Sequence, residues 1–356
     1  MLPLQPHLNI YMQAKEDQLI ETDELYERFS FKIDVGQEPL RIDKYLMNRI
    51  ERATRNKIQQ AIKTALVLVN GKAIKANYKI KALDEIVVYS DMNPEDLVVT
   101  PEKIELNITY EDEDLMIINK PSGMVVHPGS GNYSGTLLNG VAWYQQQHNL
   151  ENAETMPRYG LVHRIDKNTS GLLVIAKNDQ AMSHLAKQFF DHTTTRKYYA
   201  LVWGDVENET GTIAAHVGRH LRSRKLFDAF PEGDHGKEAI THYKVLERFG
   251  YVTLVECSLE TGRTHQIRVH MKYLGHPLFN DDFYGGDKIV KGTVFAKYKQ
   301  FVENCFTLCP RQALHAKTLG FIHPSSGKAM SFDSEIPNDI LKVMEKWRNY
   351  STAKKL

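Results

Sequence analysis

The sequence is poor in cysteine and has no long apolar run. Its three cysteines, Cys257, Cys305 and Cys309, are an odd and sparse set, and the last two lack a second ligand pair. This favours buried or free thiols over a zinc site. No stretch approaches the roughly twenty apolar residues that a membrane-spanning helix needs. The first residues carry acids where a secretory signal has an apolar core. We therefore expect a soluble, cytoplasmic protein with no membrane partner.

Charge is present in quantity and is unevenly distributed. The net charge is only +1, but residues 1–30 hold six acidic and two basic residues. Residues 41–81 hold eleven Lys and Arg against Asp43 and Glu51. A local basic excess of this kind is the electrostatic footprint of a nucleic-acid-binding module. A merely solvated basic face, which serves solubility, is the alternative interpretation.

The basic segment has the pattern of two helices and a hairpin. Apolar residues at helical spacing predict one helix over 42–50 and a second over 58–65. A strand is predicted over 66–69, and Asn70-Gly71 is a strong signal for a tight hairpin. The candidate RNA contacts are the cations on the outer side of these elements: Arg41, Lys44, Arg52, Arg55 and Lys57.

The composition and the predicted secondary structure of the chain change after residue 90. Residues 91–104 are acidic and contain proline, which is typical of a linker. Two helices are predicted further on, one of them capped by Asp179, at 179–192 and 264–274. Strands are predicted around them at 115–119, 198–203, 240–247 and 251–258. Helices scattered among strands without a regular repeat predict an α+β fold with a mixed sheet.

Residues 159–177 are the most informative segment. Two short apolar runs flank a polar turn, which predicts two buried strands with Asp166 at the tip between them. Arg164 and Lys167 flank this carboxylate and should keep it ionised at neutral pH. A positioned, ionised aspartate suits a nucleophile or a general base. An aspartate that only bridges its neighbours in a loop is the alternative.

Three further segments carry polar residues in apolar surroundings. In the strand 196–204, only one of the adjacent Tyr198 and Tyr199 can face a pocket. On a helix, Arg263 and Arg268 diverge by about 140° and cannot hold the same group. The third segment is 311–316, which contains an arginine and a histidine.

Other candidate sites fail on spacing. His265 and His270 point apart on a helix or on a strand, so we expect no catalytic metal. The glycine-rich segment 127–135 lacks the lysine of a phosphate loop. Asp281 and Asp282 are adjacent acids, which we expect to cap a turn or to be solvated.

Two known families share these motifs. Residues 41–81 resemble the S4 RNA-binding domain through RIDKYL, Thr54-Arg55, IQQAI and VLVNGK. The match departs from that family at Ala65 and, just after this segment, at Leu83, where the family commonly has glycine. HRIDKNTSG is similar to the HRLDxxTSG motif of the RluA-type pseudouridine synthases. Four more blocks follow that family's order: IINKPSGMVVHPGSGN, RKYYALVWG, LETGRTHQIRVHM and RQALHA.

The resemblance implies roles for individual residues. Asp166 is the essential catalytic aspartate, which attacks the ribose C1′ or the uracil ring. Tyr198 stacks on the flipped uracil, and Arg268 pairs with Asp166. Arg164 contacts phosphate or replaces the displaced base, and His163 and Arg263 are the remaining candidate RNA contacts. No cofactor and no metal are implied.

The resemblance also implies an organisation and a substrate. The expected parts are an acidic extension, an S4 domain, a linker and a catalytic domain with a mixed, mainly antiparallel sheet, at residues 1–30, 31–90, 91–104 and 105–350. The expected activity is the isomerisation of uridines in large-subunit ribosomal RNA by a monomer. A transfer RNA substrate, a non-catalytic RNA-binding or ribosome-assembly protein, and a metal-dependent hydrolase built on His163, Asp166 and His265 are the alternatives.

Overall fold

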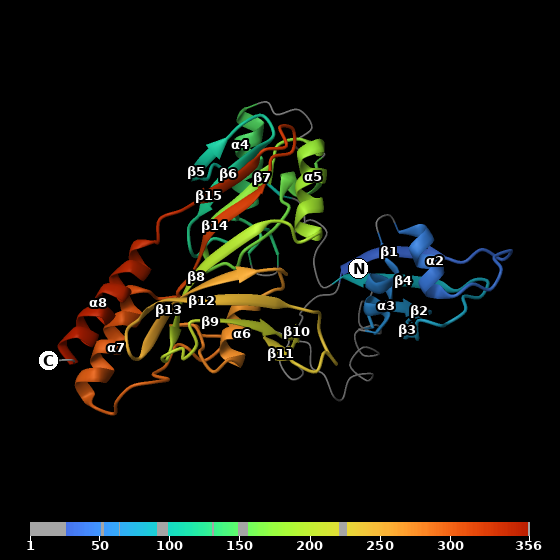
Figure 1. Ribbon diagram of the computed structural model, residues 1–356. Coiled ribbons are helices and arrows are strands. Elements are labelled where there is room, and N and C mark those ends of the chain that lie inside the picture. Colours follow the sequence, from blue (N-terminus) through green and yellow to red (C-terminus); the bar gives the residue numbers. More distant parts are fainter. Residues whose placement is uncertain are drawn as a thin grey trace. The chain divides into compact units, whose positions relative to one another are not determined.

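A computed structural model of the chain describes residues 26–50, 53–63, 65–90, 99–129, 132–148, 156–220 and 226–354. These residues form two compact units (Figure 1). The first takes in the described residues before Val98 together with Gly129–Tyr133, and the second takes in Val99–Pro128 and the chain from Ser134 onward. Residues 1–25 of the expected extension and residues 91–98 of the expected linker lie outside the described residues.

The first unit is an antiparallel sheet with two helices. Its strands follow the order β1-β4-β2-β3 and are β1 (Tyr26–Lys32), β2 (Val67–Val69), β3 (Lys72–Ala73) and β4 (Glu85–Ser90). Helices α2 (Ile42–Arg49) and α3 (Arg55–Lys63) bury apolar residues in the same core as the strands. Both helices predicted from apolar spacing are confirmed. Strand β1 begins inside the stretch that we assigned to the acidic extension.

Turns of the first unit use the left-handed backbone region at four informative positions. Asn70 and Gly71 have φ values of 49° and 74° between β2 and β3, which confirms the predicted hairpin. Ala65 and Leu83 have φ values of 56° and 68°. A side chain with a Cβ is strained there, and these are the two positions where the S4 pattern commonly has glycine.

The second unit is built on one large sheet. Its strand order is β5-β6-β7-β14-β8-β13-β12-β9, and β15 pairs with β14. All neighbouring strands are antiparallel except β7 and β14, which confirms the expected mixed, mainly antiparallel sheet. The first strands are β5 (Ile108–Glu111), β6 (Leu115–Lys120), β7 (Ser170–Ala176), β8 (Thr195–Trp203) and β9 (Thr210–Ala214). The others are β12 (Ile240–Arg248), β13 (Val252–Leu259), β14 (Leu314–Ile322) and β15 (Ala329–Asp333). A separate ribbon consists of β10 (His216–Arg219) and β11 (Phe227–Phe230).

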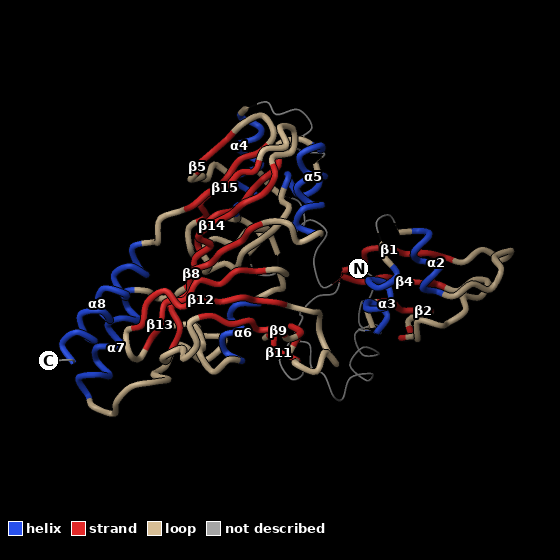
Figure 2. Tube along the Cα trace, in the orientation of Figure 1, coloured by secondary structure: helices blue, strands red, loops and turns tan. Residues whose placement is uncertain are grey.

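Helices cover both faces of this sheet (Figure 2). On one face, α4 (Leu137–Gln147) and α6 (Gln266–Tyr273) share a core with inward side chains of β6, β7 and β8. On the other face, α5 (Asp179–Phe190) packs on β7 and β14. Helices α7 (Ala296–Leu308) and α8 (Asn338–Lys354) form a third core around Trp203 and Trp347. Strand β7 is therefore buried on both sides, which explains its continuous apolar run.

Two local predictions were wrong. The segment before Asp166 is no strand: Pro157–Gly160 is a 3₁₀ turn, and Leu161 forms only an isolated bridge with Ile175. Its apolar side chains were a misleading signal, because Leu161 is buried in the core without a strand ladder. Helix α5 is capped by Asn178, which accepts a hydrogen bond from the Ala181 backbone, and not by Asp179. None of the helices among the described residues is long and apolar enough to cross a membrane.

Candidate active site

Asp166 lies in a loop whose backbone is held by a buried lysine. Its carbonyl accepts a hydrogen bond from the Thr169 backbone at 3.1 Å, which closes the turn. The next carbonyl, that of Lys167, accepts from Nζ of Lys120 at 3.0 Å. Lys120 is fully buried, and two further carbonyls, those of Pro121 and Met124, accept its other N–H bonds at 2.7 and 2.8 Å. Burial lowers the pKa of Lys120 to about 7. The loop that carries Asp166 is thus fixed to the end of β6.

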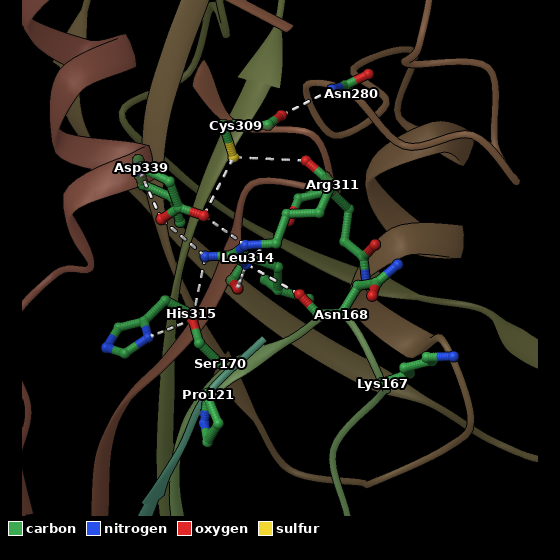
Figure 3. A network of polar contacts seen from close by, with 12 residues as sticks. Pro121, Lys167, Asn168, Ser170, Asn280, Cys309, Arg311, Leu314, His315 and Asp339 are labelled. Carbon is green, nitrogen blue, oxygen red and sulfur yellow. Dashed lines mark hydrogen bonds and ion pairs between the residues drawn. The ribbon is translucent and has the colours of Figure 1, made fainter. Parts of the chain in front are cut away.

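A buried arginine holds the other side of the same loop (Figure 3). Nη1 of Arg311 donates to the carbonyl of Asn168 at 2.9 Å, and Nη2 donates to Oγ of Ser170 at 3.2 Å. Nε and Nη2 also donate to the Asp339 carboxylate at the start of α8, at 2.7 and 3.1 Å. His315 contacts Ser170 Oγ at 2.9 Å, and burial lowers the pKa of His315 to about 4. Arg311 therefore joins the Asp166 loop to β14 and α8.

A cavity of about 470 Å³ lies beside this loop. Segments far apart in the sequence contribute to its lining, including the Asp166 loop, β8 and the start of α6. All site residues that we predicted in the second unit line it: His163, Arg164, Asp166, Tyr198, Arg263 and Arg268. The structure thus brings together residues that were predicted from separate motifs.

The central contact in the cavity is an ion pair between Arg268 and Asp166. Nη1 of Arg268 lies 3.2 Å from Oδ2 of Asp166. Nε and Nη2 of Arg268 donate to both oxygens of Asp281, each at 2.7 Å. Burial lowers the pKa of Arg268, but hydrogen bonds and charge from Asp281 outweigh burial and raise that pKa above its usual value. Arg268 is therefore a fixed cation that orients the Asp166 carboxylate.

Asp281 meets one of our two expectations: its Oδ1 caps a turn by accepting a hydrogen bond from the Phe283 backbone at 3.1 Å, but the side chain is not solvated. Its side chain is fully buried, whereas the next residue, Asp282, is exposed. Thirteen residues separate Asp281 from Arg268, and no helical or strand spacing marks them as a pair. Only the loop that returns after α6 brings them together, so this functional candidate was missed.

Tyr198 enters the cavity from β8. The residues of this strand alternate between the two faces of the sheet, so Tyr198 lines the cavity and Tyr199 packs with the other core. This confirms that only one of the two tyrosines faces the pocket. Burial raises the pKa of Tyr198, so the hydroxyl is protonated at neutral pH.

The histidines near Asp166 have protein partners. Nε2 of His163 accepts a hydrogen bond from the Val174 backbone at 3.1 Å, and its ring stacks on Phe189 with centroids 4.4 Å apart. Burial and the charge of Arg196 lower the pKa of His163 to about 3, so this imidazole is neutral. Nδ1 of His265 lies 2.7 Å from the hydroxyl of Tyr284. Across the described residues, no group of three His, Cys, Asp or Glu side chains could hold a metal ion.

The two remaining arginines differ in their exposure. Arg164 is exposed at the edge of the cavity. Arg263 is partly buried, and its Nε donates to the carbonyl of Glu238 at 2.9 Å. Contacts of Arg164, Arg263 and His163 with RNA stay predictions.

The cations of the first unit fall into two groups. Arg41 and Arg55 both bond to the carboxylate of Asp43, which is fully buried, and Gln59 adds a third contact. Lys44 and Lys57 are exposed and form no ion pair with a described residue. Arg52 lies outside the described residues.

Family models match both units. The model described as RNA pseudouridylate synthase matches residues 114–273, which include the Asp166 loop, Tyr198 and Arg268. The S4 domain model matches residues 40–86. These matches agree with the resemblance seen in the motifs.

Relatives extend the match over most of the chain. An uncharacterized RNA pseudouridine synthase of Chlorobaculum parvum is 46% identical over 89% of this chain and 97% of its own length. A ribosomal large subunit pseudouridine synthase D of Neisseria meningitidis is 41% identical over 85% of this chain and 78% of its own length.

The fold has a counterpart among solved structures. The structure of human RNA pseudouridylate synthase domain containing 4 shares the fold with a TM-score of 0.52 and 20% identity, over 68% of this chain and 93% of that chain. The sequence relatives and the two family models together show that the chain belongs to the RNA pseudouridine synthase family, with an S4 domain before its catalytic domain.

Proposed function

We propose that this chain converts uridines of large-subunit ribosomal RNA to pseudouridines, with Asp166 as the essential carboxylate. The observation that carries the proposal is the Asp166–Arg268 contact of 3.2 Å inside a cavity that Tyr198 also lines. Relatives described as ribosomal large subunit pseudouridine synthase D, about 40% identical over most of the chain, support the substrate class.

The reaction needs few groups. The N1–C1′ bond breaks, the uracil rotates, and a C5–C1′ bond forms; C5 then loses a proton and N1 gains one. Because no electrons or atoms enter from outside, Asp166 suffices as the reacting group, either at C1′ or at the uracil ring. Arg268, fixed by Asp281, keeps the carboxylate oriented toward the cavity.

The cavity also demands that the nucleotide leave its stack. A base paired inside a helix cannot reach a carboxylate within a cavity, so the target uridine is flipped out. The buried ring of Tyr198 offers a face for that base, and exposed Arg164 at the edge is placed to bind phosphate or fill the vacated position. The S4 unit adds affinity through its exposed cations and contributes little base selection.

Mapping of pseudouridine in cellular RNA tests the proposal. In cells that lack the protein, we expect loss of specific pseudouridines in large-subunit ribosomal RNA. Wild type should restore them, and Asp166→Asn, which keeps the side chain's size, should not. Restoration by a folded Asp166→Asn protein would end the proposal. Loss of sites only in transfer RNA would keep the chemistry and replace the substrate. The purified protein should retain its rate in the presence of a chelator.

A further inference from the structure

One buried cation in the cavity has no role in the mechanism above. Arg196 precedes Tyr198 by two positions on β8, so both side chains point to the same face of the sheet. Both line the cavity that contains Asp166. Arg196 is 8% exposed, as deeply placed as Tyr198 at 9%. A charged side chain in this position needs a reason.

Arg196 lacks the carboxylate partner that the other two buried arginines have. Arg268 and Arg311 each bind a carboxylate with two nitrogens. Arg196 forms no ion pair with any described residue, and its one side-chain hydrogen bond runs from Nη2 to the carbonyl of Glu260, at 2.9 Å. Its Nε is buried without an acceptor. Buried guanidinium groups are normally paired, because an unpaired charge in the interior is costly.

The surroundings leave room for this guanidinium. A Cβ added at Gly262 would lie 2.7 Å from Nη1 of Arg196, so Nη1 would have to move. Gly262 has no positive φ, so its backbone conformation does not require glycine. Its missing side chain instead leaves the space that Nη1 of Arg196 occupies. On its other side the guanidinium carbon lies 5.7 Å from the centroid of the Phe189 ring. The guanidinium group is thus held beside the cavity, and its Nε has no acceptor.

The proposed reaction supplies an acceptor of the right kind. When the N1–C1′ bond breaks, its electron pair stays with the base and spreads onto N1 and the two carbonyl oxygens. If Asp166 instead adds to the ring, the electron pair again moves onto a carbonyl oxygen. In both routes negative charge grows on an exocyclic oxygen of uracil, and it decreases again when C5 forms its bond to C1′. A preorganised donor without a competing carboxylate stabilises such a charge most effectively.

We propose that Arg196 is a catalytic residue that donates hydrogen bonds to a carbonyl oxygen of the flipped uracil as negative charge develops there. This inference rests on the proposed function, because it needs a uracil in the cavity. Arg196 would thus bind the base, whereas Arg268 holds the attacking carboxylate of Asp166. Burial lowers the pKa of His163, and the charge of Arg196 lowers it further.

Single-turnover kinetics with a uridine-containing ribosomal RNA fragment test the assignment. The first condition is that wild type converts the fragment, since failure there would refute the proposed function and not the role of Arg196. We then expect Arg196→Met to lower the rate at saturating RNA by about 10²–10³-fold. The Kd for RNA should change less than about threefold, because the charge develops only after binding.

Two more variants separate catalysis from folding. Gly262→Ala should lower the rate without removing the cation, because its methyl group displaces Nη1. Arg196→Ala should regain at least about tenfold in rate when free guanidinium is added, which a purely structural arginine would not predict. Lys197→Met is the control: this residue lies on the opposite face of the same strand, pairs with Glu256 at 3.1 Å, and should leave the rate unchanged.

Three outcomes would overturn the proposal. They are a wild-type rate in folded Arg196→Met, a loss explained fully by weaker RNA binding, and a loss in Arg196→Ala that free guanidinium does not relieve. The unfolding midpoint of each variant, measured in parallel, shows whether that variant is folded under the conditions of the rate measurement.

Discussion

The two units of this chain use charged residues in opposite ways. In the first unit the lysines of the basic segment stay in water, and one buried carboxylate, Asp43, gathers Arg41 and Arg55. In the second unit three basic side chains that fix the Asp166 loop or its carboxylate are buried: Lys120, Arg268 and Arg311. Exposed charges act at a distance and are screened by salt, whereas buried charges act only through fixed geometry. The first arrangement suits capture of a polyanion, and the second suits the positioning of one reacting group.

Removal of one buried charge should have the largest effect. Asp281→Asn leaves the guanidinium of Arg268 without its main carboxylate partner in the interior. We expect the protein to lose about 3–5 kcal/mol of stability, because the buried cation then keeps only its single contact with the Asp166 carboxylate. The single-turnover rate at saturating RNA should fall by about 10²-fold, since Arg268 no longer fixes Asp166.

The neighbouring acid provides a matched control for this prediction. Asp282→Asn makes the same chemical change one residue away at an exposed site, and it should alter neither stability nor rate. Chemical denaturation and single-turnover kinetics measure the two effects separately. A fully stable Asp281→Asn protein with the wild-type rate would show that the buried pair is dispensable.

Weakening the loop support should have a smaller effect on the rate. Arg311→Lys keeps a positive charge but cannot make the hydrogen bonds to Asn168, Ser170 and Asp339 at once. The loop that carries Asp166 then gains freedom, and we expect the single-turnover rate to fall by about tenfold, with an unchanged Kd for RNA. Arg348→Lys is the control, because Arg348 pairs with Glu247 at a largely exposed site on α8. Equal rates for both variants would contradict a positioning role for Arg311.

The exposed cations of the first unit should change binding and not chemistry. The double variant Lys44→Gln/Lys57→Gln removes two cations that lack an ion pair with a described residue. The slope of log Kd against log salt concentration should shrink by about one for each lysine that contacts phosphate. The single-turnover rate at saturating RNA should stay at the wild-type value. Lys299→Gln, which removes a cation paired with Glu303 on α7, should leave the slope as it is.

This contrast also explains which features were predictable from the sequence. Local sequence patterns correctly predicted the helices of the first unit, the Asn70-Gly71 hairpin and the opposite orientations of Tyr198 and Tyr199. In each case neighbours along the chain determine the outcome. The flanking cations marked Asp166 as a candidate nucleophile or general base, its pairing with Arg268 came from the resemblance, and the structure adds the distance between them.

Features that depend on how distant segments meet were not predictable. Asp281 looked like a solvated acid, because its partner lies beyond a helix and a turn. The segment around Leu161 looked like a strand because it is apolar. A buried loop needs apolar residues just as a buried strand does, so composition does not distinguish them. Asn178 and Asp179 are equally good caps by residue type, so only the backbone geometry decides between them.

The smallest expected effect concerns backbone strain in the first unit. Leu83 has a φ of 68° and is 60% exposed, so its side chain adds strain and contributes little burial. Glycine adopts this region freely, and Leu83→Gly should therefore stabilise the first unit by about 0.5–1 kcal/mol after the entropy cost of glycine. Met47→Gly is the control, because Met47 is also exposed but lies in α2, where glycine should destabilise by about 1 kcal/mol. All three tryptophans belong to the second unit, so amide hydrogen exchange of residues 29–90 in the full chain is the measurement. Lower protection in Leu83→Gly than in wild type would mean that the leucine contributes packing that outweighs its strain.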